Sequence, residues 1–76
     1  MINKIGLTEK ENLVYQAIVE FMSENNYAPT VRELVSMTKI NSTATVRGYI
    51  DRLKRKGYLT CKPSIARSIV IKQVTE

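Results

Sequence analysis

Residues 41–57 read NSTATVRGYIDRLKRKG, and they decide the fold because they describe one amphipathic helix with a marked start and end. Ser42 is a favourable N-cap residue, and Gly57 follows three consecutive cations, which is typical of a helix C-terminus. An apolar stripe recurs at helical spacing between them: Val46, Tyr49, Ile50 and Leu53. We expect a helix over residues 43–56 that packs this stripe on a core and presents its other face outward.

Two segments before this helix carry the signals of a helix start. Residues 8–11 (TEKE) and 30–33 (TVRE) both have the capping-box pattern, in which the threonine and glutamate side chains satisfy the first free backbone N–H groups. Apolar residues at helical spacing after the first box predict a helix over about residues 9–23, and the second box predicts a short helix over residues 31–37. Pro29 disfavours helix in the residue before it and separates the two.

Alternating apolar residues replace the helical pattern in the last part of the chain. Residues 58–61 and 67–71 are expected to form two strands joined by residues 62–66. Three apolar side chains would then face the helices: Leu59, Ile69 and Ile71. The short second helix, a turn over residues 38–41 and the longer third helix, followed by this hairpin, give the order of a winged helix-turn-helix domain. The predicted fold class is mainly α with a small β-hairpin, in which three helices are followed by a two-stranded wing over residues 58–71.

Length and composition indicate one folded domain over residues 1–76, with its core over about residues 7–71. A hydrophobic content of 43% with only 3 glycines and 2 prolines favours a folded, mostly helical chain. No apolar run approaches the ~20 residues of a membrane span, and the first residues lack the apolar core of a signal peptide. We therefore expect a cytoplasmic protein that does not bind membranes.

Catalytic and metal chemistry are not expected from these residue types. Cys61 is the single cysteine and histidine is absent, which leaves no internal disulfide and no Cys/His metal site. We recognise no pairing of a nucleophile with a base, no carboxylate dyad and no phosphate loop. The sequence therefore predicts neither an enzyme nor a cofactor.

Positive charge is concentrated in the second part of the chain. The formal net charge is +5, but residues 1–27 hold two lysines against four glutamates, a net −2. Residues 28–76 hold ten lysines and arginines against three carboxylates, a net +7. Such a distribution is typical of a protein that binds a polyanion, whereas a basic surface kept for solubility is the alternative.

The outward face of the 43–56 helix suits the major groove of DNA, where the second helix of a helix-turn-helix lies. Its first residues are small and allow close approach to base edges: Ser42, Thr43, Ala44 and Thr45. Glycine inside a helix costs about 1 kcal/mol relative to alanine, so Gly48 indicates either a close approach or neutral drift. Arg47 is the best candidate for a base contact, and an ion pair with Asp51 is its alternative role. Cations further along are expected to face phosphates: Arg52, Arg55 and Lys56.

Together these residues make the chain resemble the N-terminal DNA-binding domain of the LexA repressor family. The matching stretches, which together cover roughly residues 7–71, are LTEKEN, NYAPTVREL, STATVRGYIDRLKRKGYL and PSIARSIVI. The resemblance implies base contacts at Ser42, Ala44, Thr45, Arg47 and Gly48. It also implies phosphate contacts from the start of the second helix and from the wing, and we place these at Thr30, Arg32, Lys62 and Arg67.

Repressors of that family also carry a C-terminal serine–lysine peptidase domain that cleaves itself and mediates dimerisation. The 76 residues contain nothing like it, so self-cleavage is not expected of them. They are expected to be either a free-standing domain or a fragment of a longer protein.

Two functions compete at this point. The first is sequence-specific binding of double-stranded DNA in transcriptional regulation, with repression as the expected direction, by a monomer that pairs on DNA or with a partner protein. The alternative is a winged-helix module that binds another protein and no DNA, since fold does not dictate function. An exposed apolar patch around Ile40, Ile65 or Val70 would favour the alternative.

Overall fold

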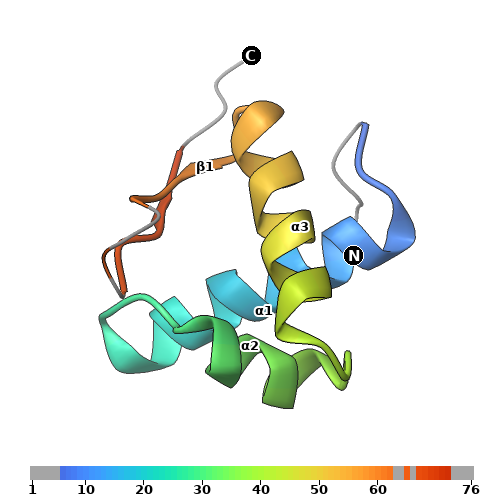
Figure 1. Cartoon of the computed structure of the whole chain (residues 1–76). Helices are drawn as coiled ribbons and strands as arrows, with labels where there is room; N and C mark the ends of the chain where they lie inside the picture. Colours follow the sequence, from blue (N-terminus) through green and yellow to red (C-terminus); the bar gives the residue numbers. More distant parts are fainter. Residues whose placement is uncertain (1–5, 63–64, 66, 73–76) are drawn as a thin grey trace.

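A computed structural model describes residues 6–62, 65 and 67–72, and these form three helices followed by a two-stranded antiparallel sheet (Figure 1). The elements are α1 (Glu9–Asn25), α2 (Val31–Thr38), α3 (Thr43–Arg55), β1 (Leu59–Thr60) and β2 (Val70–Ile71). The winged helix-turn-helix expected from the sequence is confirmed.

Side-chain caps start each of the three helices. In α1 the Glu11 N–H donates to the Thr8 hydroxyl (3.2 Å) and the Thr8 N–H donates to the Glu11 carboxylate (3.0 Å). The same reciprocal pair joins Thr30 and Glu33 at the start of α2 (2.8 and 3.2 Å). The hydroxyl of Ser42 caps α3 by accepting a backbone N–H bond of 3.2 Å. Both predicted capping boxes and the predicted N-cap are therefore confirmed.

The first two helices end later than the sequence predicted. They extend to Asn25 and Thr38, and each is closed by the next residue, Asn26 or Lys39, in the left-handed conformation (φ 61° for both). Thr38 was expected in the turn but belongs to α2. Its buried hydroxyl donates to the Leu34 carbonyl one turn earlier (2.7 Å), which satisfies this polar group inside the domain.

The end of α3 follows the expected glycine pattern. Gly57 has φ 85°, and its N–H donates to the Lys54 carbonyl (3.1 Å). The Tyr58 N–H reaches back to the Leu53 carbonyl (3.0 Å), which completes a Schellman motif. This motif turns the chain sharply from α3 into β1 (Figure 1).

One hydrophobic core lies between the three helices and the base of the wing. Helix α1 packs against both α2 and α3, and α3 also contacts β1. The core residues are Val14, Tyr15, Ala17, Ile18, Ala28, Leu34, Val46, Ile50, Leu53, Leu59 and Ile69. The predicted α3 stripe is therefore buried, except that Tyr49 is only half-buried at its edge. This packing fixes which face of α3 is left outside.

The wing has less regular pairing than the sequence predicted. Each strand has two residues, with Leu59 opposite Ile71 and Thr60 opposite Val70. Arg67 was expected in the second strand, but its left-handed conformation (φ 58°) is incompatible with a strand. Leu59 and Ile69 are buried and Ile71 is half-buried, as the alternation predicted.

Beyond the strands a side chain holds the wing together. The Ser68 hydroxyl accepts from the Lys62 N–H and donates to the Lys62 carbonyl, both at 2.9 Å. Positions 63, 64 and 66 of the predicted loop lie outside the described residues. Figure 1 shows the wing running from the end of α3 down to the loop between α1 and α2.

Candidate nucleic-acid interface

The outward face of α3 carries the residues that the sequence singled out for base contacts. Five of them are exposed: Thr43, Ala44, Thr45, Arg47 and Gly48. Ser42 is half-buried, and its hydroxyl accepts the N-capping bond of α3. A Cβ atom built on Gly48 meets nothing within 4 Å, so packing inside the domain does not require glycine there. Close approach of a partner and neutral drift both remain compatible with this position.

A groove of about 570 Å³ runs between the start of α2, the outward face of α3 and the wing. The cations that line it come from all three elements: Arg32, Arg47, Lys54, Lys62 and Arg67. Asp51 is the one carboxylate among its described lining residues. A concave surface with this charge balance attracts an extended anion such as a nucleic-acid backbone.

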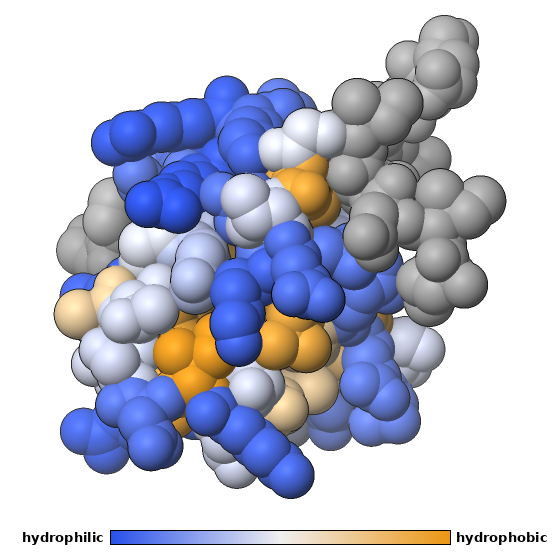
Figure 2. Space-filling model, turned by 90° about the vertical axis from the view of Figure 1, so that its right-hand side faces the viewer, coloured by the Kyte–Doolittle hydropathy of each residue, from blue (hydrophilic) through white to orange (hydrophobic). Residues whose placement is uncertain are grey.

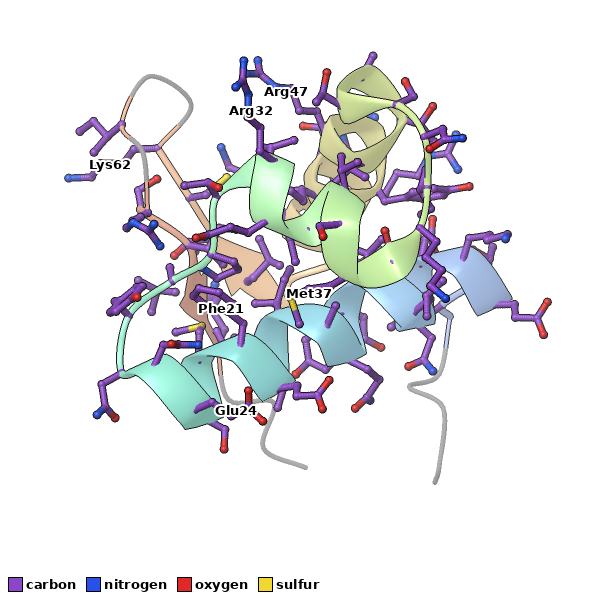
Figure 3. The ribbon with its side chains drawn as sticks, turned by 90° about the horizontal axis from the view of Figure 1, so that it is seen from below. Phe21, Glu24, Arg32, Met37, Arg47 and Lys62 are labelled. Atoms are coloured by element: carbon purple, nitrogen blue, oxygen red, sulfur yellow. The ribbon has the colours of Figure 1, made fainter. Side chains whose placement is uncertain are left out.

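Figure 3 shows Arg32 on α2 and Arg47 on α3, and both side chains point toward the same edge of that view, away from the helical body. Lys62 points outward from the wing, and Glu24 lies at the opposite edge of the view, on α1. Within the part of the chain that the structure describes, no ion pair involves the Arg32, Arg47 or Lys62 side chain. The tertiary fold therefore places these unpaired cations along the same groove.

Lys54 lines the same groove but was not among the candidate site residues. It had been interpreted only as one of the cations at the C-terminal end of the helix. Its spacing of seven residues from Arg47 was the signal that places both on one helical face. Its position adds Lys54 to the side chains that could contact phosphate in the groove.

Some charged side chains on α3 have partners within the domain. Asp51 pairs with Arg55 at 2.9 Å, both partners being exposed, so this carboxylate does not take Arg47 as its partner. Arg52 lies with its guanidinium carbon 5.8 Å from the centre of the Tyr49 ring. Exposed pairs such as Asp51 with Arg55 stabilise a protein only weakly.

Glu11 is a buried carboxylate (2% exposed) that binds the end of α3 to the start of α1. Lys56 donates to it at 2.7 Å and also donates to the Gly6 carbonyl, while Arg52 lies 3.8 Å away. The hydrogen bond from Lys56, followed by that from the Thr8 N–H, lowers the pKa of Glu11. Lys56 and Arg52 therefore have contacts within the domain, and their contacts with phosphate stay predictions.

Arg67 also has partners within the domain. Its Nη1 donates to the Ala28 carbonyl (2.9 Å) and to Glu33 Oε1 (3.0 Å), and its Nη2 donates to Glu33 Oε2 (3.1 Å). Its guanidinium carbon lies 4.6 Å from the centre of the Tyr27 ring. The hydrogen bond from Arg67, and next that from the Thr30 N–H, lowers the pKa of Glu33. Phosphate contact by Arg67 or Thr30 is an expectation that these distances do not test.

Exposed apolar side chains are present on the wing. Ile65 and Val70 on the wing are 55% and 58% exposed, whereas Ile40 is half-buried against the core. Ile65 lines the basic groove itself. Figure 2 shows the face at the right of Figure 1, where apolar areas are interrupted by hydrophilic side chains. Nothing here favours a protein-docking surface over the basic groove.

Comparison with known proteins gives a consistent result. The family described as the LexA DNA binding domain matches residues 4–68. The LexA repressor of Caldicellulosiruptor saccharolyticus is 40% identical over 68 residues, which are 90% of this chain and 34% of that protein. The LexA repressor of Lactiplantibacillus plantarum is 40% identical over 62 residues (82% and 30%), and that of Clostridium perfringens is 31% identical over 68 residues (90% and 34%). The chain spans about a third of the length of these relatives. Because the family match covers residues 4–68, most of the chain, the chain belongs to the LexA DNA-binding domain family.

Proposed function

We propose that this domain binds double-stranded DNA sequence-specifically and takes part in transcriptional repression. The observation that carries the proposal is the basic groove bordered by the outward face of α3, because it offers unpaired cations beside the small exposed residues at the start of that helix. Membership in a DNA-binding family supports the same function, and the relatives are named repressors.

In the proposed complex the first half of α3 lies in the major groove. Arg47 has the reach and the planar donor pair to bind guanine through two hydrogen bonds. The small residues Thr43, Ala44 and Thr45, with Gly48, let the helix approach the base edges. Arg32, Lys54 and Lys62 then contact phosphates on either side, and Arg55 does so once it leaves Asp51. Phosphate contacts set the register, and base contacts set the sequence preference.

The oligomeric state on DNA can be inferred from the small area that one such domain buries on DNA. A single module of this kind buries about 600–1,000 Å² of protein surface and reads few base pairs. We therefore propose that the domain is a monomer in solution and pairs on half-sites about one helical turn apart, or binds with a partner protein.

The proposed activity is binding alone, with no reaction and no cofactor. No helix in the described residues has both the length and the apolar character needed to cross a membrane. Because operator DNA is its proposed partner, we place the protein in the cytoplasm.

The test is an anisotropy titration of the whole chain against a random duplex and against duplexes selected from a random library, at low and moderate salt. The logarithm of the association constant should fall linearly with the logarithm of salt concentration, with a slope of about −0.9 per phosphate neutralised. A selected duplex should bind more tightly than the random one at the same salt. Equal binding to all duplexes would leave only non-specific DNA binding. Absence of binding at low salt would favour a protein partner instead.

A further inference from the structure

Arg67 occupies a position where three groups converge. The carboxylate of Glu33, the carbonyl of Ala28 and the ring of Tyr27 all contact its guanidinium. Tyr27 in turn packs edge-on against Phe21 of α1, with ring centres 5.6 Å apart. We call this set of contacts the Arg67 clamp. It joins the wing to the start of α2, to the loop before it and to α1.

The geometry of the clamp is specific to arginine. Two parallel N–H bonds to one carboxylate require the planar fork of a guanidinium, which lysine lacks. The Nη1 group makes two hydrogen bonds and Nη2 makes one, all between 2.9 and 3.1 Å. Arg67 also holds φ at 58°, a conformation uncommon for residues other than glycine. Side-chain contacts that hold the residue from several directions explain why this conformation persists.

The Glu33 carboxylate both caps α2 and binds Arg67 of the wing. Its Oε1 accepts from the Thr30 N–H (2.8 Å), which closes the cap of α2, and from Arg67 (3.0 Å). The first turn of α2 and the wing are therefore fixed relative to each other. Arg32 lies in that turn and Lys62 lies on the wing, so the clamp also fixes the distance between two walls of the basic groove.

The wing needs such an attachment because its own pairing is short. Two residue pairs make up the ladder, and an isolated two-stranded hairpin is marginally stable in water. Leu59 and Ile69 anchor the base of the wing in the core. Further out, the hydrogen bonds in the described residues are those of Arg67, those between Ser68 and Lys62, and one from the Ile65 N–H to the Lys62 carbonyl (3.1 Å).

We propose that Arg67 acts as a positioning residue which holds the wing against α2 through Glu33, and so presets the width of the DNA-binding groove. This inference rests on the proposed DNA binding for its consequence, but the clamp itself is a property of the free domain. It differs from the phosphate contact expected for Arg67 from the sequence resemblance, because a guanidinium engaged by Glu33 and Ala28 acts on DNA through the wing.

Glu33→Gln separates the two roles by the sign of its effect. Glutamine at this position still serves a capping box, but it removes one negative charge and weakens the fork. If Arg67 were a phosphate ligand restrained by Glu33, the variant would bind DNA more tightly. If the clamp positions the wing, the variant binds more weakly, by about two- to tenfold, because ordering side chains and segments at the moment of association is unfavourable.

Arg67→Lys and Arg67→Ala complete the test, with Lys62→Ala as the matched control on the same wing. Lys62→Ala should make the salt slope shallower by about 0.9, since a phosphate contact is lost. Arg67→Lys should weaken binding as much as Arg67→Ala, and both should keep the wild-type salt slope. A shallower slope for Arg67→Ala, with wild-type affinity for Arg67→Lys, would make Arg67 a phosphate ligand and overturn the proposal.

A measurement without DNA separates this inference from the DNA-binding function. Amide hydrogen exchange of the free domain should show faster exchange for the Lys72 N–H, which bonds to the Tyr58 carbonyl across the wing, in Glu33→Gln and Arg67→Lys. Amides in the middle of α1 should keep their wild-type exchange rates. Unchanged exchange in the wing of both variants would refute the clamp even if DNA binding is normal. Faster wing exchange in a protein that binds no DNA would leave the clamp standing and reject the proposed function.

Discussion

Gly48 gives the sharpest test of how α3 is used, because stability and DNA binding should respond to it in opposite directions. It lies in the interior of α3 with a helical backbone, and a Cβ atom at this position would meet nothing within 4 Å. Gly48→Ala therefore changes helix propensity without adding or removing a contact in the domain. The unfolding free energy should rise by about 0.8–1.0 kcal/mol. For a domain of this size that corresponds to an increase in Tm of about 4–8 °C.

The same substitution places a methyl group on the face proposed to enter the major groove. Gly48→Ala should therefore weaken specific DNA binding although it stabilises the protein. Gly48→Glu should lower the affinity for specific and random duplexes by more than about tenfold, or ~1.4 kcal/mol, because it puts a long anion beside the bases and phosphates. Ser23→Ala, at an exposed position of α1, should leave DNA affinity unchanged and serves as the control.

The assay combines thermal and urea unfolding followed by circular dichroism with anisotropy titrations of each variant. Destabilisation by Gly48→Ala would contradict the open space around this glycine and the helical assignment. A folded Gly48→Glu variant that binds DNA as well as wild type would falsify the placement of α3 in the groove. The protein-interaction function would then become the better explanation.

Three further outcomes follow from the packing and the charges. Leu53→Ala should lower the unfolding free energy by roughly 2–5 kcal/mol, because Leu53 is fully buried, and a harmless result in urea melts would mean that the α3 stripe is misplaced. Arg47→Ala should weaken binding to the preferred duplex by ~1–3 kcal/mol and to random DNA by much less, and an equal loss on both would assign Arg47 to phosphate. The pKa values of Glu11 and Glu33 are lowered below 4.5 in the folded domain, so their contribution to stability is present above that value and is lost as the pH falls through the folded pKa. Urea melts at neutral and acidic pH should therefore show acid destabilisation that Glu11→Gln reduces, and an unchanged pH profile in that variant would contradict the role of Glu11.

The sequence by itself determined the features that depend on residues close together in the chain. A capping box needs Thr and Glu three residues apart, the α3 stripe needs a helical spacing of apolar residues, and the end of α3 needs one glycine. All three were read correctly because such interactions form within one or two helical turns. The net +7 of residues 28–76 likewise indicates a polyanion partner from the sequence alone.

Only the tertiary structure decided the partners of the charged side chains. Lys56 meets Glu11 across 45 positions of the chain, and Arg67 meets Ala28 and Glu33 across 39 and 34. Contacts between residues so far apart leave no local pattern in the sequence. Charge and resemblance alone therefore predicted phosphate contacts for both cations. The wing shows the same limit, because the left-handed turn at Arg67 is stabilised by those distant partners and ends the strand that alternation predicted. Sequence periodicity predicts which face of a helix or strand is buried. The group that a given side chain contacts depends on how separate elements pack together.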